Sequence, residues 1–177
     1  MLIRPAEPAD FTAIADIYRD GVLHGTGTFD EVPPTASALQ ARWQEITAMN
    51  LPYLVAVEGD NIIGFAYASP FRQRVAYRYG VEDSIYVHPD HKGAGVGKAL
   101  LSALITACTE GGFYAIYAVI GDAANTGSIR LHETLGFEHT GTLPRAGYKF
   151  DRWIDVIFMM KTLRPMDGPA EGTGWAI

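Results

Sequence analysis

Hydrophobic positions along the chain follow two spacings, one typical of helices and one typical of strands. Between residues 10 and 22, Phe11, Ile14, Ile17 and Tyr18 share one helix face, and Asp10 can cap the start of that helix. The same reasoning predicts helices at 37–49, 97–110 and 125–135. Short apolar runs bounded by turn residues predict strands at 2–5, 53–58, 62–69, 79–87, 114–120, 137–147 and 153–161.

These elements follow the order β-α-α-β-β-β-α-β-α-β-β, which mixes strands and helices without strict βαβ alternation. We therefore expect an α/β (or α+β) fold with a central sheet of mixed direction. No repeat or linker interrupts the pattern, so residues 1–163 are expected to form a single domain. The segment 164–177 contains prolines and glycines and is expected to be a loose tail.

Composition and charge narrow the classes of function. The 177 residues are 48% hydrophobic and carry a net charge of −6, which argues against binding to nucleic acid or an anionic membrane. Cys108 is the only cysteine, so no internal disulfide can form, and its spacing from apolar neighbours suggests a buried thiol. The start of the chain shows no secretory signal, so a cytoplasmic location is expected.

The most informative segment, V-H-P-D-H-K-G-A-G-V-G-K, covers residues 87–98 between a predicted strand and a predicted helix. A glycine-rich loop at this place exposes backbone N–H groups at the positive end of the helix, and that geometry binds phosphate. The spacing fits neither the dinucleotide fingerprint nor the P-loop. The alternative is a helix-capping turn without a ligand. Two lysines and three glycines would contact the anion: Lys92, Gly93, Gly95, Gly97 and Lys98.

Two segments resemble the GCN5-related N-acetyltransferases. The stretch from Lys92 to Gly97 resembles their acetyl-CoA loop, Q/R-x-x-G-x-G/A, with lysine at the first position. The stretch from Asn125 to Phe137 resembles N-x-x-S/A-x-x-L/F-Y/H-x-x-x-G-F/Y, and the order of elements over residues 1–163 is similar to the family's. The resemblance implies a sheet of about seven strands flanked by about four helices.

The resemblance also implies acetyl-CoA as co-substrate, and it implies no metal. The residues implied to bind acetyl-CoA are Tyr86, Val87, Lys92, Gly93, Ala94, Gly95, Val96, Gly97, Lys98, Asn125 and Ser128. His132 stands where many relatives carry a tyrosine that protonates the departing thiolate, so it is the candidate general acid. His88 and His91 flank Pro89 in a loop, and a metal site there is not expected.

Glu82 is a carboxylate within an otherwise apolar predicted strand. Period-two alternation places Glu82, Ser84 and Tyr86 on one face, and Asp83 on the other. Acyl transfer to an amine needs a base because an ammonium has no lone pair, and a partly buried carboxylate can serve directly or through water. Glu82 is therefore the candidate base. Asp83 is the competing carboxylate, and a solvent-facing edge-strand glutamate is the alternative.

A basic connector precedes this strand. Arg72 and Arg74 offer guanidinium forks that bind carboxylate or phosphinate, although the segment alone is also consistent with a solvated loop. R-x-A-Y at 74–77, V-E-x-S-x-Y-V at 81–87 and G-T-L-x-x-A-G-Y-K at 141–149 together resemble the phosphinothricin and methionine sulfoximine acetyltransferases.

That resemblance implies an N-acetyltransferase acting on the α-amine of a small amino-acid analogue. It implies that four residues contact the substrate: Phe29, Arg72, Arg74 and Tyr77. We expect a homodimer. Two other functions stay open: acetylation of an N-terminal or other peptide amine, and a CoA-binding sensor or scaffold without turnover.

Overall fold

The computed structural model describes residues 1–175, which contain seven strands and four α-helices in the predicted order. The strands are β1 Leu2–Pro5, β2 Tyr53–Glu58, β3 Asn61–Pro70, β4 Gly80–Val87, β5 Ala115–Gly121, β6 Glu138–Lys149 and β7 Arg152–Thr162. The helices are α1 Phe11–His24, α2 Ala36–Ala48, α3 Val96–Glu110 and α4 Thr126–Thr134. Short 3-10 helices at Pro8–Asp10, Val75–Tyr77 and Pro89–His91 lie in connections and were not predicted.

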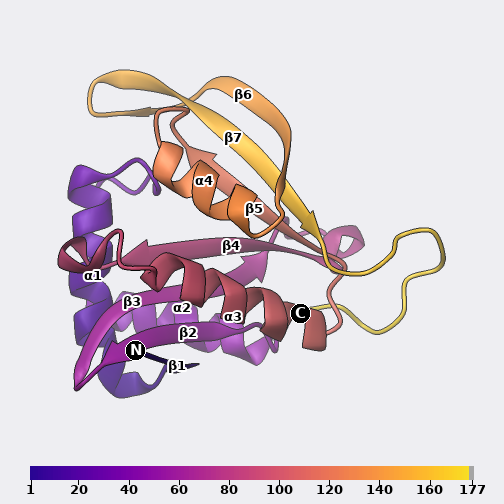
Figure 1. The fold of residues 1–177 in the computed structure, drawn as a ribbon, viewed down its shortest axis with the longest axis horizontal. Helices are drawn as coiled ribbons and strands as arrows, with labels where there is room; N and C mark the ends of the chain where they lie inside the picture. The colour runs from indigo at the N-terminus through magenta and orange to yellow at the C-terminus, as the bar shows by residue number, and fades with distance from the viewer. Residues whose placement is uncertain (176–177) are drawn as a thin grey trace.

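The strands form one mixed sheet in the order β1-β2-β3-β4-β5-β7-β6. Strands β1 to β4 are antiparallel neighbours, β4 and β5 are parallel, and β7 runs antiparallel between β5 and β6. Figure 1 shows the long β6–β7 hairpin at one end of the sheet and the short β1 at the other. The predicted fold class is confirmed.

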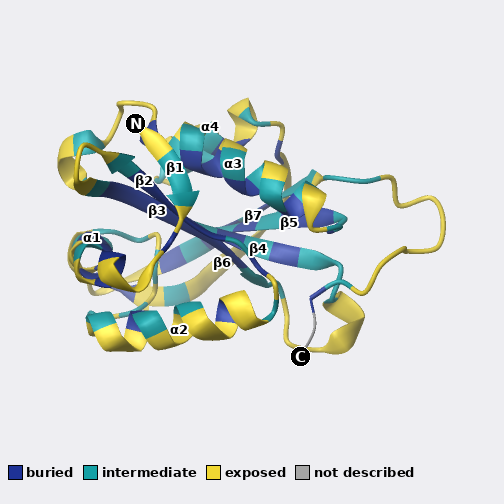
Figure 2. Ribbon diagram, turned by 90° about the horizontal axis from the view of Figure 1, so that it is seen from below, coloured by how far each residue is buried: buried dark blue, intermediate teal, exposed yellow. Residues whose placement is uncertain are grey.

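The helices cover both faces of the sheet. Figure 2 shows α1 and α2 on one side of the sheet and α3 and α4 on the other. In α1 the predicted apolar stripe is buried, and Phe11 packs against Tyr53 of β2 while Tyr18 packs against Phe65 of β3. Within residues 1–175, no helix is both long enough and apolar enough to span a membrane.

Strands β4 and β5 separate after a short parallel contact. Their register pairs Gly80–Glu82 with Ala115–Tyr117, whereas β4 continues to Val87 and β5 continues to Gly121. The backbone groups beyond the last pair are therefore free to meet other partners. The two strands open a wedge that begins next to Glu82.

The turn of the β6–β7 hairpin is shorter than predicted. The predicted strands end at residue 147 and begin at residue 153, whereas β6 continues to Lys149 and β7 begins at Arg152. Lys149 pairs with Arg152, so the turn consists of Phe150 and Asp151 alone. Both turn residues have positive φ, 53° and 55°, a conformation that usually favours glycine or asparagine. No glycine marks this turn, which is why the sequence pattern left a gap there.

Residues 164–175 form no helix or strand, and hydrogen bonds connect them to the rest of the chain. The N–H of Glu171 donates to the Tyr114 hydroxyl at 2.7 Å, and the N–H of Trp175 donates to the carbonyl of Arg78 at 3.0 Å. The indole of Trp175 is buried. A large apolar side chain near the end of the chain therefore fastens this segment to the connector before β4.

Candidate active site

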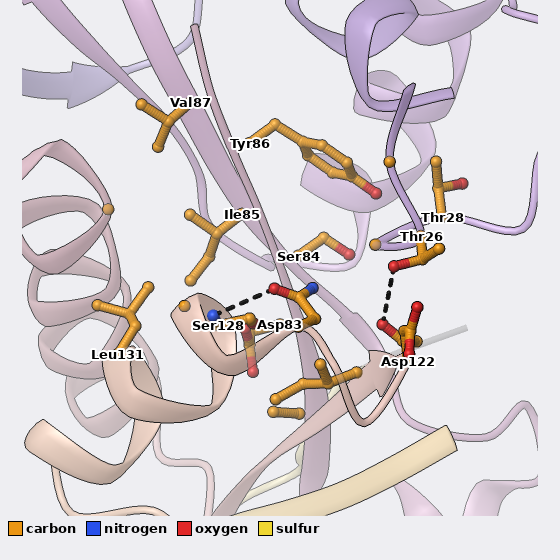
Figure 3. A pocket seen from close by; sticks show the side chains of 18 of the residues that line it. Thr26, Thr28, Asp83, Ser84, Ile85, Tyr86, Val87, Asp122, Ser128 and Leu131 are labelled. Atoms are coloured by element: carbon orange, nitrogen blue, oxygen red, sulfur yellow. Dashed lines mark hydrogen bonds between the residues drawn. The ribbon is translucent and has the colours of Figure 1, made fainter. Parts of the chain in front are cut away.

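A cavity of about 1140 Å³ opens where β4 and β5 diverge. Strand β4 runs along it, with the glycine-rich loop and the start of α4 on one side and the loop of residues 25–30 on the other. Figure 3 shows Tyr86 and Ser84 pointing toward Thr28, and Ile85 and Val87 lying on the side of Leu131. The predicted alternation along β4 is therefore present, and it divides the cavity into two halves.

The glycine-rich loop leads into the N-terminus of α3. Gly93 and Gly95 have φ of 80° and 83°, and a Cβ atom at either position would meet no neighbour within 4 Å. The first α-helical hydrogen bond runs from the N–H of Ala99 to the carbonyl of Gly95, so the N–H groups of residues 96–98 precede it. These donors and the helix dipole form an anion-binding site at one end of the cavity.

Most residues predicted to bind acetyl-CoA line this cavity. They are Tyr86, Val87, Lys92, Gly93, Gly95, Gly97, Lys98, Asn125 and Ser128. Ala94 and Val96 do not line it, and Val96 is 2% exposed because its side chain packs into the core. The Lys92 ammonium lies 3.3 Å from the Asp20 carboxylate, and the side chain of Asn125 caps α4 by accepting from the N–H of Ser128.

Glu82 lies beside the point where the two strands part, on the face of β4 that α1 and α2 cover. Its side chain is partly buried, and Arg72 lies 3.8 Å away. Burial raises the pKa of Glu82 to about 7, with the Arg72 charge opposing the rise and Asp83 adding to it. A carboxylate whose pKa is close to neutral accepts a proton far more readily than an ordinary glutamate. Glu82 therefore has the properties of a general base.

Asp83 and His132 form a pair on the opposite face of β4. The Nε2 atom of His132 is 3.0 Å from Oδ2 of Asp83, and Nδ1 is 2.7 Å from the carbonyl oxygen of Ser128. The carbonyl can only accept, so Nδ1 carries a proton. Burial alone would lower the pKa of His132, but the hydrogen bond and charge of Asp83 outweigh it and raise that pKa. His132 also lines the cavity, and its role as the general acid stays a prediction.

The predicted substrate residues are divided between two places. Phe29 lines the main cavity, but Arg72, Arg74 and Tyr77 do not. Arg72 reaches Glu82 and lies over the ring of Phe71, and Tyr77 lines a separate cavity of about 250 Å³. The connector contains a 3-10 helix at Val75–Tyr77. Arg74 and Tyr77 thus lie outside the lining of the cavity that contains Glu82, and their contact with the substrate stays a prediction.

The loop of residues 25–30 forms the wall opposite β4. The hydroxyl of Tyr18 donates to the Asp30 carboxylate at 2.8 Å and lies 2.9 Å from the Thr28 hydroxyl. The hydroxyl of Thr26 donates to the carbonyl of Gly121 at 3.2 Å, as Figure 3 shows. The loop is thus fixed to both α1 and β5, and it presents Phe29 to the cavity.

Several cavity residues were not found from the sequence. Arg42 projects from α2 into the cavity lining. Burial lowers the pKa of Arg42, but the neighbouring Tyr67 and Tyr18 raise it by more, so the pKa is raised overall. A charged residue on the polar face of an amphipathic helix gives no signal that separates it from a solvent-facing one. Other residues missed include Tyr18, Thr26, Thr28, Asp30, Tyr67, Ile120, Gly121, Asp122 and Arg152.

Fold and site together define an acyltransferase, in which an anion-binding helix terminus and a raised-pKa carboxylate share one cavity. The model of the acetyltransferase (GNAT) family matches residues 11–137. A phosphinothricin N-acetyltransferase of Alcaligenes faecalis is 42% identical over 165 residues, which cover 93% of this chain and 84% of that protein. An L-methionine sulfoximine/L-methionine sulfone acetyltransferase of Salmonella typhimurium is 38% identical over 163 residues, covering 92% and 95%.

A solved structure agrees with these relatives. The phosphinothricin acetyltransferase of Sinorhizobium meliloti, in complex with AcCoA, is 44% identical and superposes with a TM-score of 0.89. The match covers 94% of this chain and 94% of that chain. The chain belongs to the GNAT family and is an N-acetyltransferase. The family predicted from the glycine-rich loop and the 125–137 segment is confirmed.

Proposed function

We propose that this enzyme transfers the acetyl group of acetyl-CoA to the α-amine of a small amino-acid-like substrate of the phosphinothricin or methionine sulfoximine type. The observation that carries the proposal is that Glu82, with a pKa of about 7, shares one cavity with the glycine-rich loop. The names of the relatives, which act on phosphinothricin and on methionine sulfoximine or sulfone, support the substrate class.

The residues at the glycine-rich loop fit a CoA diphosphate. The N–H groups of residues 96–98 and the ammonium groups of Lys92 and Lys98 supply the donors and the charge, and the glycines leave the backbone accessible. The unpaired edge of β4 beyond Glu82 offers backbone groups to the pantetheine arm, and the start of α4 at Ser128 lies on the facing side. Acetyl-CoA, when bound there, would supply the thioester carbonyl for attack by the free amine; the C–S bond would break as the amide bond forms, and CoA would leave as its thiol after taking up the proton that the nitrogen loses.

Glu82 takes the proton from the substrate ammonium, directly or through a water, and so frees the lone pair. Its partial burial keeps the pKa near neutrality, so that the carboxylate is largely ionised above pH 7 and still basic enough to accept the proton. Arg72 lies close enough to stabilise the ionised form. The Asp83–His132 pair holds α4 against β4, and so keeps Ser128 in place beside the reaction.

The test is a thiol-release assay with acetyl-CoA against four groups of acceptors: free amino acids, their sulfoximine and sulfone analogues, phosphinothricin, and short peptides. We expect release with one or more of the free amino-acid analogues and none with peptides. Release with peptides alone would favour the peptide-amine alternative. Tight acetyl-CoA binding without release from any acceptor would favour a sensor or scaffold.

We also propose that the chain forms a homodimer in the cytoplasm. The support is that β6 is an edge strand of the sheet and that Leu143, Tyr148 and Trp153 of the β6–β7 hairpin expose 52%, 52% and 62% of their surface. Large exposed apolar side chains on one element are typical of an interface. Light scattering on the purified protein should give twice the chain mass, and a single-chain mass would contradict the dimer.

A further inference from the structure

We propose that Lys149 is a positioning residue that holds the 25–30 loop in the shape that presents Phe29 to the cavity. The inference rests on the proposed function in one respect, because it takes the Phe29 side of the cavity to receive the amine substrate. Lys149 does not line the cavity itself, and it acts through the loop.

The contacts of Lys149 point in this direction. It ends β6, is 3% exposed, and its Nζ donates to the carbonyl oxygens of Gly25 and Thr28, each at 2.9 Å. Within residues 1–175 no carboxylate lies at salt-bridge distance from this ammonium, although the charges of Asp30 and Glu31 act on it from farther away, so its hydrogen-bond partners are those two loop carbonyls. Burying an ammonium is costly unless hydrogen bonds replace its water. Because one ammonium bonds two carbonyls three residues apart, both carbonyls must point toward it, and the loop bends around the ammonium.

The absence of a side chain at Gly147 leaves room for the Phe29 ring. A Cβ atom at Gly147 would lie 2.6, 2.8 and 2.9 Å from three atoms of the Phe29 ring. The ring thus occupies the space that a side chain of β6 would fill. A Cβ atom at Gly121 would lie 2.1 Å from the carbonyl oxygen of Thr26, so the loop backbone lies directly on β5 as well.

These contacts link the β6–β7 turn to substrate binding. The turn of Phe150 and Asp151 follows Lys149 immediately, so the residue that holds the loop lies at the end of the hairpin. Lys149 then sets the curl of the loop, and Gly147 sets the depth of the Phe29 ring. Loss of the ammonium should loosen the wall that faces the acceptor, while the glycine-rich loop at the other end of the cavity is unaffected.

The test compares Lys149→Met with wild type and with Lys161→Met, a control on β7 that lies outside the cavity lining. Methionine has similar length but cannot donate. We expect the KM for the amine substrate to rise about ten-fold or more, because two charge-assisted hydrogen bonds are lost. The KM for acetyl-CoA should change less than about two-fold, and Lys161→Met should match wild type in both constants.

A double-mutant cycle separates positioning from a general loss of stability. If Lys149 acts through Phe29, the Lys149→Met and Phe29→Ala double variant should have the same acceptor KM as Phe29→Ala alone. Gly147→Ala, which keeps Lys149 and displaces the ring, should also raise the acceptor KM, and it decides the case if Lys149→Met does not fold. An unchanged acceptor KM in folded Lys149→Met or Gly147→Ala, or full additivity in the cycle, would overturn the proposal.

Hydrogen exchange gives a readout that does not depend on turnover. Amides of residues 25–30 should exchange faster in Lys149→Met than in wild type, while amides of α3 should not change. Unchanged exchange in the loop would contradict the positioning role. If the wild-type protein transfers no acetyl group, the proposed function is refuted. If the exchange of residues 25–30 still differs between wild type and Lys149→Met, the role of Lys149 in the loop stands.

Discussion

His132 and Asp83 form a buried ion pair, 3.0 Å apart, with side chains that are 4% and 3% exposed. Asp83 is the first residue of β4 beyond its last parallel partner on β5, and His132 belongs to α4. The pair therefore joins the helix to the strand at the point where the sheet opens. Because the cavity begins at that point, this contact holds the two sides of the wedge together.

Replacing His132 with leucine should destabilise the protein, because the Asp83 carboxylate would remain buried without its partner. Removing one member of a buried pair typically costs about 3–5 kcal/mol. Urea unfolding at about pH 6 measures the loss, since the raised pKa of His132 keeps the imidazolium charged there. Asp90→Asn is the control, because its pair with His88 is exposed and 3.8 Å long. A loss equal to that of the control would contradict a tight buried pair.

Glu82→Gln should lower kcat by about 10²- to 10⁴-fold while acetyl-CoA binding is retained, because glutamine keeps the shape of the side chain and cannot accept the proton. The base works only when ionised, so kcat/KM of the wild type should rise with pH and level off above about 7, the pKa of Glu82. The pH profile of both proteins checks this. A rising limb with the same midpoint in Glu82→Gln would assign the titrating group to another residue.

The fold could be predicted because its signals are local. The apolar stripe of α1 and the glycine-rich loop each depend on residues close in sequence, and both lie where the pattern placed them. Glu82 was found for the same reason, since a carboxylate in an apolar strand stands out.

The rest of the site depends on contacts between residues that lie far apart in the sequence, and such contacts leave no local pattern. Lys149 meets Gly25 across 124 residues, and nothing in either segment marks the other as a partner. Arg74 was predicted to contact the substrate from its chemistry and from the resemblance of its segment to the subfamily, but it does not line the cavity. Side-chain chemistry predicts what a residue can bind, whereas only tertiary packing decides which cavity it faces.

Gly95→Asp should abolish the stabilisation by acetyl-CoA, which is about 2.7 kcal/mol at a hundred-fold excess over Kd. The new carboxylate would occupy the anion site with a negative charge, and the space around the Cβ position is open. Gly59→Asp is a matched control, since Gly59 also has positive φ and open space but lies in the β2–β3 turn. Melting curves with and without acetyl-CoA should show the shift in the control alone, and a normal shift in Gly95→Asp would refute the loop as the binding site.

Arg42→Gln should raise the KM for an amino-acid substrate about ten-fold or more, with little change in the KM for acetyl-CoA. Arg42 lines the cavity beside Tyr18 and Tyr67, on the sheet face that carries Glu82, and within residues 1–175 it has no salt bridge. A guanidinium there can hold a substrate carboxylate while Glu82 receives the amine, and a hydrogen bond to a charged group is worth about 1.5–3 kcal/mol. Steady-state kinetics of Arg42→Gln beside Arg74→Ala check this. An effect confined to Arg74→Ala would place acceptor recognition on the connector.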